Sequence, residues 1–198
     1  EHVNGLIQQT DQSYLAFGMS TSLGQNGING LIFKIDGMGE LLWTKVLDHA
    51  GGTEVMEAQP TPDGDVIIAV LASGSANGYD SIIAKMNAEG EILWAKTISG
   101  PGAENPVSLL VSNNEIVLLS GSSSFSLDGD QGTLLTKLDL DGNLIWMKFF
   151  DLPGYEKPLK LIEHPSGGYA VWGHLNHLNS ASYDAWMMRI TDDGDFVF

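Results

Sequence analysis

Residues 33–45 read FKIDGMGELLWTK, and the same pattern returns as AKMNAEGEILWAK at 84–96 and as TKLDLDGNLIWMK at 136–148. A fourth copy, MRITDDGDFVF, occupies residues 188–198. The first basic residues of successive copies are 51, 52 and 52 positions apart. Self-similarity at a fixed period of this length indicates a repeat architecture. The sequence therefore predicts four copies of one structural unit.

Basic and aromatic side chains mark each copy at fixed places. Seven of the nine Lys and Arg residues fall on two positions of the repeat, and only Lys157 and Lys160 do not. The first basic position is held by Lys34, Lys85, Lys137 and Arg189, and the aromatic position by Trp43, Trp94, Trp146 and Phe198.

Each unit divides into four short apolar runs separated by turn residues. In the second unit we expect strands at 55–59, 66–72, 81–87 and 92–98, because runs rich in Val, Ile and Leu bounded by Gly, Asn, Asp and Pro are typical of strands. No segment keeps the 3.6-residue apolar period of a helix over a dozen residues. The fold class is predicted to be all-β.

Several of the runs, such as residues 65–71 and 115–119, are apolar without alternation, as in strands covered on both faces. Radially packed sheets provide that environment, and a four-stranded unit of this length is a propeller period. We predict a single β-propeller domain over residues 1–198, built from four four-stranded antiparallel blades of 51–52 residues. The expected blades are 1–49, 50–100, 101–152 and 153–198. A closed four-blade ring is slightly favoured over half of a larger ring, which would self-associate or belong to a longer chain.

The composition excludes several classes of partner. The 25 Asp and Glu against nine Lys and Arg give a formal charge of −16, which repels nucleic acid and anionic membranes. No apolar run approaches the roughly 18 residues of a spanning helix, so no membrane insertion is expected. The absence of Cys excludes disulfides and thiol catalysis. No signal peptide is seen, as would also hold for a mature exported chain.

The Lys-Ile/Leu-Asp-x-x-Gly-x-x-x-Trp-x-Lys signature, preceded by Tyr79-Asp80 or Tyr183-Asp184, resembles bacterial β-propeller repeats of the SBBP and Delta-60 type. The junction Gly51-Gly52-Thr53-Glu54 matches a further feature of those repeats. The resemblance covers the whole chain and implies a propeller on an extracellular or cell-surface protein. It is specific for the fold and implies no particular activity.

Two enzymatic propeller families share part of this spelling. Quinoprotein-like repeats have a gap between Asp and Gly that is one residue longer than the gap from Asp139 to Gly142, and the sequence shows no pocket for their cofactor. Sialidases need three arginines for the substrate carboxylate, and Arg189 is the only Arg in this sequence. Neither activity is expected.

The recurring side chains are predicted to serve architecture. The Trp should fill the gap between neighbouring blades, and the Lys two residues later should lay its stem across the ring. A ligand-binding ladder is the alternative. The junction acids Glu54, Glu104 and Glu156, with Glu1 in the equivalent place, recur in step with the lysines. We expect each to pair with a repeat Lys and to lock one blade to the next.

Departures from the repeat are where a ligand site is sought. Asp128 and Asp130 flank Gly129 and are a candidate Ca²⁺ site, with a solvated turn as the alternative. His49, His174 and His177 lie in loops of the same predicted face, although nothing in their spacing brings them together. Trp172 replaces a smaller side chain of the other units, either in the core or beside the propeller axis.

No catalytic constellation is present, and no cofactor is expected beyond the candidate Ca²⁺. The sequence predicts a non-enzymatic module for binding or assembly, with a protein, a glycan or a cation as ligand. The alternative is a polysaccharide hydrolase or lyase, for which Glu57 and Glu163 are the available axis-facing carboxylates.

Overall fold

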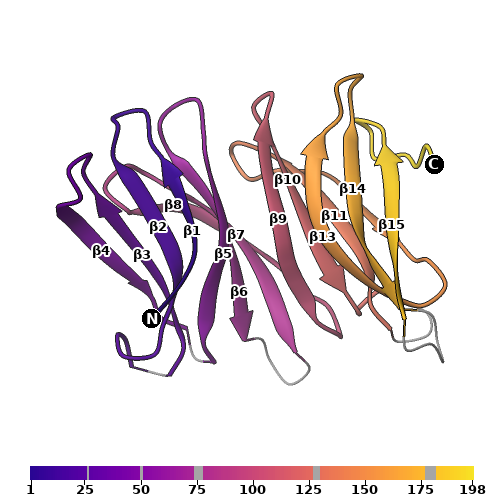
Figure 1. Ribbon diagram of the computed structural model, residues 1–198, viewed down its shortest axis with the longest axis horizontal. Coiled ribbons are helices and arrows are strands. Elements are labelled where there is room, and N and C mark those ends of the chain that lie inside the picture. Colours follow the sequence, from indigo (N-terminus) through magenta and orange to yellow (C-terminus); the bar gives the residue numbers. More distant parts are fainter. Residues whose placement is uncertain (26, 50, 74–77, 127–129, 177–181) are drawn as a thin grey trace. The chain divides into compact units, whose positions relative to one another are not determined.

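The computed structural model describes residues 1–198 apart from 26, 50, 74–77, 127–129 and 177–181. The described residues form fifteen strands in four antiparallel sheets (Figure 1). No helix in this part of the chain is long and apolar enough to cross a membrane. The predicted all-β fold, with one sheet for each repeat, is confirmed.

The chain divides into two compact units, Glu1–Ile98 and Ser99–Phe198. Each unit holds two sheets, called blades 1 to 4 in chain order. The division falls two residues before the predicted end of the second blade, and the single domain over residues 1–198 stays a prediction.

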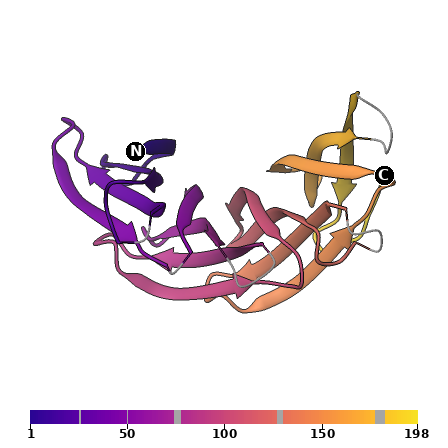
Figure 2. The same ribbon diagram turned by 90° about the horizontal axis from the view of Figure 1, so that it is seen from below.

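Unit 1 contains blades 1 and 2, whose strands are hydrogen-bonded in sequence order. Blade 1 comprises β1 (His2–Gln8), β2 (Tyr14–Ser20), β3 (Asn29–Ile35) and β4 (Leu41–Leu47). Blade 2 comprises β5 (Thr53–Pro60), β6 (Val66–Ser73), β7 (Tyr79–Met86) and β8 (Ile92–Ile98). Figures 1 and 2 show these two sheets side by side.

Unit 2 contains blades 3 and 4. Blade 3 comprises β9 (Glu104–Ser112), β10 (Glu115–Ser122), β11 (Gly132–Asp139) and β12 (Leu144–Phe150). Blade 4 comprises β13 (Tyr155–Glu163), β14 (Tyr169–Asn176) and β15 (Tyr183–Ile190).

The fourth strand predicted for blade 4 is represented only by its beginning. Ile190 forms an isolated antiparallel bridge with Phe196, and Arg189 N donates to Phe198 O at 2.9 Å. Phe198 is therefore opposite Arg189, as Trp146 is opposite Lys137 in blade 3. The repeat register persists to the end of the sequence although blade 4 has three assigned strands.

The hairpin turn between the third and fourth strands explains why Asp or Asn and Gly recur at fixed positions of the repeat. Asp36 Oδ1 accepts hydrogen bonds from the backbone N–H groups of Met38 and Glu40, at 2.8 and 2.9 Å. Asn87 and Asp139 do the same in blades 2 and 3. The glycine three residues later has a positive φ in every blade, which an L side chain rarely adopts, at Gly39, Gly90, Gly142 and Gly194.

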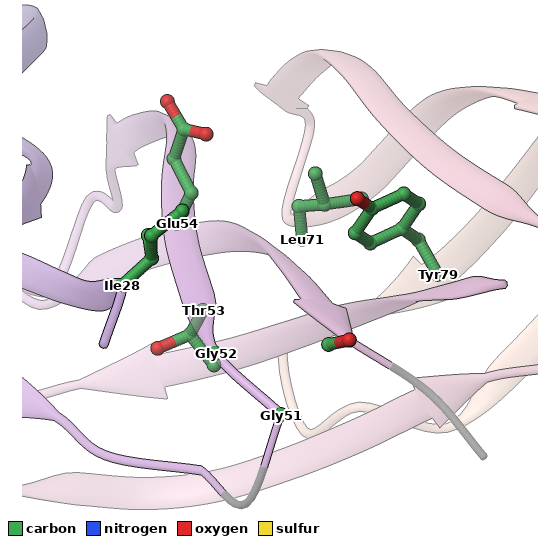
Figure 3. Close-up of a pocket in the computed structure, with 8 residues that line it drawn as sticks. Ile28, Gly51, Gly52, Thr53, Glu54, Leu71 and Tyr79 are labelled. Atoms are coloured by element: carbon green, nitrogen blue, oxygen red, sulfur yellow. The ribbon is translucent and has the colours of Figure 1, made fainter. Parts of the chain in front are cut away.

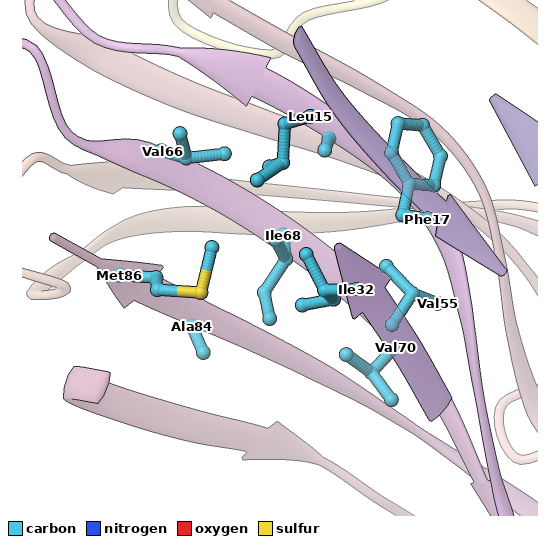
Figure 4. Packing of buried hydrophobic residues seen from close by; sticks show 10 residues of the cluster. Leu15, Phe17, Ile32, Val55, Val66, Ile68, Val70, Ala84 and Met86 are labelled. Atoms are coloured by element: carbon cyan, nitrogen blue, oxygen red, sulfur yellow. The ribbon is translucent and has the colours of Figure 1, made fainter. Parts of the chain in front are cut away.

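The apolar core of each unit lies where its two blades face each other. In unit 1, Leu15, Phe17 and Ile32 of blade 1 pack with residues of blade 2 that include Val55 and Ile68 (Figure 4). In unit 2, Val117, Leu119 and Leu135 of blade 3 pack with blade 4 in the same way. The second strands of blades 2 and 3 are buried on both faces, which accounts for their unbroken apolar runs.

Candidate functional site

The first strand of every blade contains a β-bulge, which aligns the four blades independently of sequence. The extra residues are Asn4, Met56, Val107 and Leu159. The residues three positions before them are Glu1, Thr53, Glu104 and Glu156. Thr53, and not Glu54, is therefore the counterpart of the junction glutamates. The prediction that Glu54 belongs to that repeated set is wrong, because the sequence does not reveal the bulges that fix the register.

The residues at this repeated position form hydrogen bonds either within their own blade or with the preceding blade. In blades 1 and 3, Glu1 accepts from Ser20 and Ser22, and Glu104 accepts from Ser122 and Ser124. In blades 2 and 4 the residue reaches back to the third strand of the preceding blade. Thr53 Oγ1 accepts from Gly30 N at 2.8 Å, and Glu156 Oε2 accepts from Thr133 Oγ1 at 2.8 Å.

Glu156 is a carboxyl group without solvent exposure. Burial raises its pKa to about 7, and this effect outweighs the hydrogen bonds from Leu152 N and Thr133 Oγ1, which favour the charged form. The nearby charges of Asp151 and Asp130 act in the same direction as burial. Glu156 is thus a titratable contact between blades 3 and 4.

The repeat lysines pair with acids near the turn that joins the first two strands of their own blade. Lys34 Nζ lies 2.9 Å from Asp11 Oδ2, and Lys137 Nζ lies 2.6 Å from Glu115 Oε2. Lys85 Nζ pairs with Asp63 at 2.7 Å and with Asp65 at 3.2 Å. The predicted pairs between junction glutamates and lysines are wrong, because the turn acids meet these lysines inside one blade.

The two exposed aspartates of these pairs titrate well below the usual range. The pKa of Asp11 is lowered to about 2 by hydrogen bonds from Ser13 and then Lys34. The pKa of Asp63 is lowered to about 2 by hydrogen bonds from Lys85 and then Thr61. Both aspartates therefore remain charged across the physiological pH range.

The Trp-x-Lys pair of one blade contacts the hairpin turn of the next. Trp43 Nε1 donates to Ala88 O at 3.3 Å in unit 1, and Trp146 Nε1 donates to Asp192 O at 3.0 Å in unit 2. A Cβ atom on the turn glycine of the next blade would meet both members of the pair. At Gly90 it would lie 2.8 Å from Lys45 and 3.1 Å from Trp43. At Gly194 the corresponding neighbours are Lys148 and Trp146.

This contact between neighbouring blades is called the Trp-x-Lys clamp, and it involves Trp43 and Trp146, for which an inter-blade role is expected. Trp94 lies in β8 opposite Lys85, in the same register. The buried Lys137 lies 6.0 Å from the Trp146 ring centroid and 5.6 Å from that of Tyr169. Cation, indole and phenol therefore form one structural cluster between blades 3 and 4.

Glu54, freed from the repeated position, lines a pocket at the junction of blades 1 and 2 (Figure 3). The cavity has a volume of about 150 Å³. It lies on the face predicted to carry ligands, where Ile28 before β3, the start of β7 at Tyr79 and the glycines of the blade junction meet. The lining residues of this junction pocket are Ile28, Gly51, Gly52, Thr53, Glu54, Leu71, Ser73 and Tyr79.

Backbone hydrogen bonds hold the junction pocket in shape. Thr53 N donates to Ile28 O at 3.0 Å, and Ser73 N donates to Gly52 O at 2.8 Å. Gly52 has a φ of 104°, and a Cβ atom on Gly51 would lie 2.7 Å from Ser73 Cβ. Two glycines are therefore required here, the first for close approach and the second for its backbone conformation.

The polar side chains that line the junction pocket come from three adjacent strands, β5, β6 and β7. Glu54 is opposite Leu71 in the β5–β6 ladder, and Ser73 is opposite Tyr79 in the β6–β7 ladder. Glu54 Oε1 accepts a hydrogen bond from Asn4 Nδ2 at 2.8 Å. The Tyr79 side chain is about half exposed, at 49%, and lies beside Leu71 in Figure 3. The pocket combines an aromatic face, aliphatic walls and a single carboxylate.

Sequence reasoning did not identify the pocket residues as a site. In the sequence, Tyr79 belongs to the repeated Tyr-Asp motif, and Glu54 aligns by residue type with the junction glutamates. The counterparts of Glu54, two residues before each bulge, are His2, Asn105 and Lys157. Their chemical diversity is the signal that this position is not structural, and it is visible only once the bulges are known.

A second cavity in unit 1, of about 360 Å³, separates β4 from β6 and β7. Its lining is mainly aliphatic, including Ile68, Val70 and Ile82, and His49 also lines it. The hydroxyl of Thr53, another lining residue, is already hydrogen-bonded to Gly30 N and Leu47 O. This cavity could enclose an apolar group but has few side chains that could form hydrogen bonds with a ligand.

The other candidate residues are not brought together. Asp128 and His177 lie outside the described residues, and Asp130 accepts a hydrogen bond from Ser126 Oγ. Within the described ranges no group of three or more His, Asp or Glu side chains could hold a metal ion. The Ca²⁺ site at Asp128 and Asp130 stays a prediction. The ring of His174 lies 6.3 Å from that of Tyr183.

The two carboxylates considered for catalysis lie in different units. Glu163 accepts hydrogen bonds from Ser112 Oγ at 2.9 Å and from Asn113 Nδ2 at 3.1 Å, so it joins blade 4 to blade 3. Glu57 follows the bulge of β5 in unit 1.

The four antiparallel sheets and their blade-to-blade contacts define an all-β protein of the β-propeller type. No family model matches the sequence, and no curated protein matches it. Among solved structures, a variant of Synechocystis apocarotenoid oxygenase is similar with a TM-score of 0.52 and 13% identity. The match covers 93% of this chain and 45% of the oxygenase, so the chain spans less than half the length of that protein.

A second similar structure is a GH43 beta-1,3-galactosidase with galactodeoxynojirimycin. Its TM-score is 0.53 at 10% identity, and the match covers 96% of this chain and 72% of the galactosidase. The cobalt-substituted form of the oxygenase gives a TM-score of 0.51 at 13% identity, with 93% and 45% coverage. At these identities the similarities establish the fold alone.

Proposed function

We propose that this protein is a non-enzymatic binding module that holds a neutral sugar residue of a glycan in the junction pocket. The observation that carries the proposal is that the half-exposed Tyr79 and the acidic Glu54 line the same small cavity. Pockets for drug-sized ligands usually measure about 300–1,000 Å³. A cavity of about 150 Å³ is suited to a single ring or a group of similar size.

The chemistry of the lining favours a sugar over other ligands. The Tyr79 ring offers an apolar face for the C–H face of a pyranose, and its hydroxyl adds a polar end. A carboxylate can accept hydrogen bonds from sugar hydroxyl groups through its two oxygens, and Oε1 of Glu54 already accepts one from the Asn4 side-chain amide. The formal charge of −16 disfavours acidic sugars and supports a neutral ligand.

The lining also supports binding without cleavage. Glycoside hydrolysis ordinarily needs two carboxyl groups about 5–10 Å apart. Among the residues that line the junction pocket, Glu54 is the only acid.

A polysaccharide hydrolase is the second candidate function. It is favoured by the similarity in fold to the GH43 galactosidase, and Glu57 and Glu163 would be its carboxylates. The hydrogen bonds that commit Glu163 to Ser112 and Asn113 weigh against this role.

The repeated sequence motif supports two further parts of the proposal, the type of propeller repeat and the location of the protein. The Trp-motif signature and the Gly51-Gly52 junction support membership of the SBBP and Delta-60 type of propeller repeat. That resemblance in turn supports an extracellular or cell-surface location, where a glycan ligand would be available. A protein partner is the other ligand class compatible with the acidic surface.

The test is an array of neutral oligosaccharides probed with the full chain, followed by calorimetry with the strongest binder. Tyr79→Ala and Glu54→Gln should each weaken binding at least tenfold. Tyr183→Ala is the matched control, because Tyr183 occupies the same repeat position in blade 4 and is also exposed. Binding that survives both pocket substitutions contradicts the proposal. Release of new reducing ends from the bound oligosaccharide supports the hydrolase instead.

A further inference from the structure

The second cavity of unit 1, called the inter-blade cavity, lies between β4 of blade 1 and strands β6, β7 and β8 of blade 2. Its volume of about 360 Å³ falls in the range of about 300–1,000 Å³ that is usual for small-molecule pockets. Val46 and Ile92 line the cavity and are exposed by 36% and 43%. The cavity is therefore open to solvent, and a ligand can enter it.

The floor of the inter-blade cavity belongs to the apolar core of unit 1. Ile68, Val70 and Ala84 line the cavity and are buried members of the core cluster shown in Figure 4. Leu47 and Ile82 also line the cavity and pack against the same cluster. A ligand in this cavity would extend the apolar contact between blades 1 and 2.

Three of the lining residues are smaller than the residues at the same positions of unit 2. The register of the ladders gives the pairs as Leu47 and Phe150, Ile82 and Trp186, and Ala84 and Met188. In unit 2, Phe150 and Trp186 pack against the apolar core, and Met188 is a buried member of it. Two aromatic rings and a thioether thus pack where unit 1 has aliphatic side chains.

Two lining residues are larger than their counterparts, but they replace only part of the missing volume. Val70 corresponds to Gly173, and Ile68 corresponds to Val171. A Cβ atom on Gly173 would lie 2.7 Å from the Trp186 ring, so this indole packs directly on the glycine. Val70 and Ile68 add only aliphatic groups, whereas an indole and a phenyl ring are missing. The inter-blade cavity therefore corresponds to space that aromatic side chains fill in unit 2.

We propose that the inter-blade cavity binds a small neutral aromatic molecule of about the size of indole. Unit 2 identifies the chemistry of the occupant, because aromatic side chains pack at the corresponding place between its two blades. Apolar cavities inside proteins take up aromatic guests such as benzene. Transfer of the ligand ring and of the cavity walls out of water supplies the free energy of binding.

The polar residues beside the inter-blade cavity favour a neutral ligand over an anion. Asp48 and His49 line the cavity together with the aliphatic residues. The Asp48 carboxylate and the formal charge of −16 both repel an anionic ligand. Binding here is independent of the sugar proposed for the junction pocket, although Thr53 lines both cavities.

The experiment is calorimetric titration of the full 198-residue chain with indole and with p-cresol, and with indole-3-acetate as an anionic comparison. At least one of the two neutral compounds should bind at a single site with a negative change in heat capacity, because apolar surface is buried. Indole-3-acetate should bind at least tenfold more weakly than indole. An equal affinity for indole-3-acetate contradicts the assignment of a neutral ligand.

Substitutions that restore the side chains of unit 2 locate the site. Leu47→Phe and Ala84→Met fill the inter-blade cavity and should each weaken binding at least tenfold. Ile82→Trp is unsuitable, because Val70 lies where Gly173 makes room for the indole in unit 2.

Leu41→Phe is the matched control, because Leu41 is 62% exposed on the same strand as Leu47 and does not line the cavity. This control should bind the ligand as tightly as the native chain. Far-UV circular dichroism establishes that each variant is folded, and Ala84→Val replaces a filling variant that fails this check. Absence of binding of both indole and p-cresol overturns the proposal. Binding that survives the filling substitutions also overturns it, since the ligand then lies elsewhere.

Discussion

Lys137 Nζ lies 2.6 Å from Glu115 Oε2, and the two residues belong to neighbouring strands of one blade. The lysine is buried, at 4% exposure, whereas the Glu115 side chain is about one-third exposed. Lys137 Nζ also donates to Asp192 O of blade 4 at 3.3 Å. The ion pair fixes the lysine within its own blade, and the lysine in turn contacts the next blade.

Because Lys137 is buried and Glu115 is partly exposed, we expect substitutions of the two residues to lower the free energy of unfolding by different amounts. Glu115→Gln leaves a buried cation without its counter-ion and should lower the free energy of unfolding by about 2–3 kcal/mol. Lys137→Met keeps the stem between the rings and leaves Glu115 where water can solvate it, so the loss should be about 1 kcal/mol. Urea unfolding of both variants measures the difference.

Lys148→Met serves as the control for loss of a repeat lysine. Its Nζ lies 3.5 Å from Asp195 Oδ1 and its side chain is 41% exposed, so the free energy of unfolding should hardly change. A Lys137→Met variant less stable than Glu115→Gln would show that burial of the cation is not the dominant effect.

Two turn glycines with the same backbone conformation differ only in what covers them. Gly90 has a φ of 79° and Gly39 a φ of 90°, so alanine should cost about 1 kcal/mol of backbone strain at either position. At Gly90 the new methyl group also meets Lys45 and Trp43 of the clamp, which should cost a further 1–3 kcal/mol, on the order of other overpacked contacts.

Thermal unfolding of Gly90→Ala and Gly39→Ala compares the two costs directly. Since the backbone strain cancels, the difference in unfolding free energy reports the clamp alone. Equal destabilisation of the two variants would mean that the Trp-x-Lys clamp does not hold blade 2 to blade 1.

The repeat and the strand class are predictable from the sequence, because both depend on spacing along a single strand or hairpin. The expected strand at 66–72 is β6 (Val66–Ser73), and the strand at 92–98 is reproduced without change. The partners of Lys34 and Lys137 could not be predicted, because a cross-strand contact depends on where the turn between the first two strands folds back. Glu54 was misplaced because its residue type matches Glu104, whereas the bulges at Met56 and Val107 align Thr53 with Glu104.

Thr53 takes the place of the junction glutamate in blade 2. We expect that loss of its hydroxyl group lowers the free energy of unfolding. Its Oγ1 accepts from Gly30 N at 2.8 Å and donates to Leu47 O at 2.5 Å, and the residue is 5% exposed. Thr53→Val has the same shape but leaves a buried donor and acceptor unpaired, so the free energy of unfolding should fall by about 2 kcal/mol.

Thr53→Ser is the matched control because it keeps the hydroxyl group and removes only a methyl group. It should retain most of the stability in the same denaturant titration. If Thr53→Val were as stable as the native chain, the hydrogen bonds across the blade 1–blade 2 junction would contribute nothing to the fold.

Because the pKa of Glu156 is raised, we expect its contribution to the stability of the folded chain to decrease as the pH rises, which is unusual for an acid. Burial raises its pKa to about 7 in the folded chain, above the ordinary value of 4.5. The folded state therefore binds more protons than the unfolded state between pH 4.5 and 7, so its contribution to stability is complete below pH 4.5 and is lost as the pH rises to 7. A shift of this size corresponds to about 3 kcal/mol.

Glu156→Gln removes this titration while keeping an uncharged side chain of the same shape. Relative to the native chain, the variant should gain about 3 kcal/mol of stability between pH 4.5 and pH 8, as measured by urea unfolding at a series of pH values. Glu163→Gln, at an exposed position of the same strand, is the comparison variant that removes a different carboxylate. A constant difference between native and Glu156→Gln chains across this range would mean that Glu156 is ionised in the folded state and that another group compensates its burial.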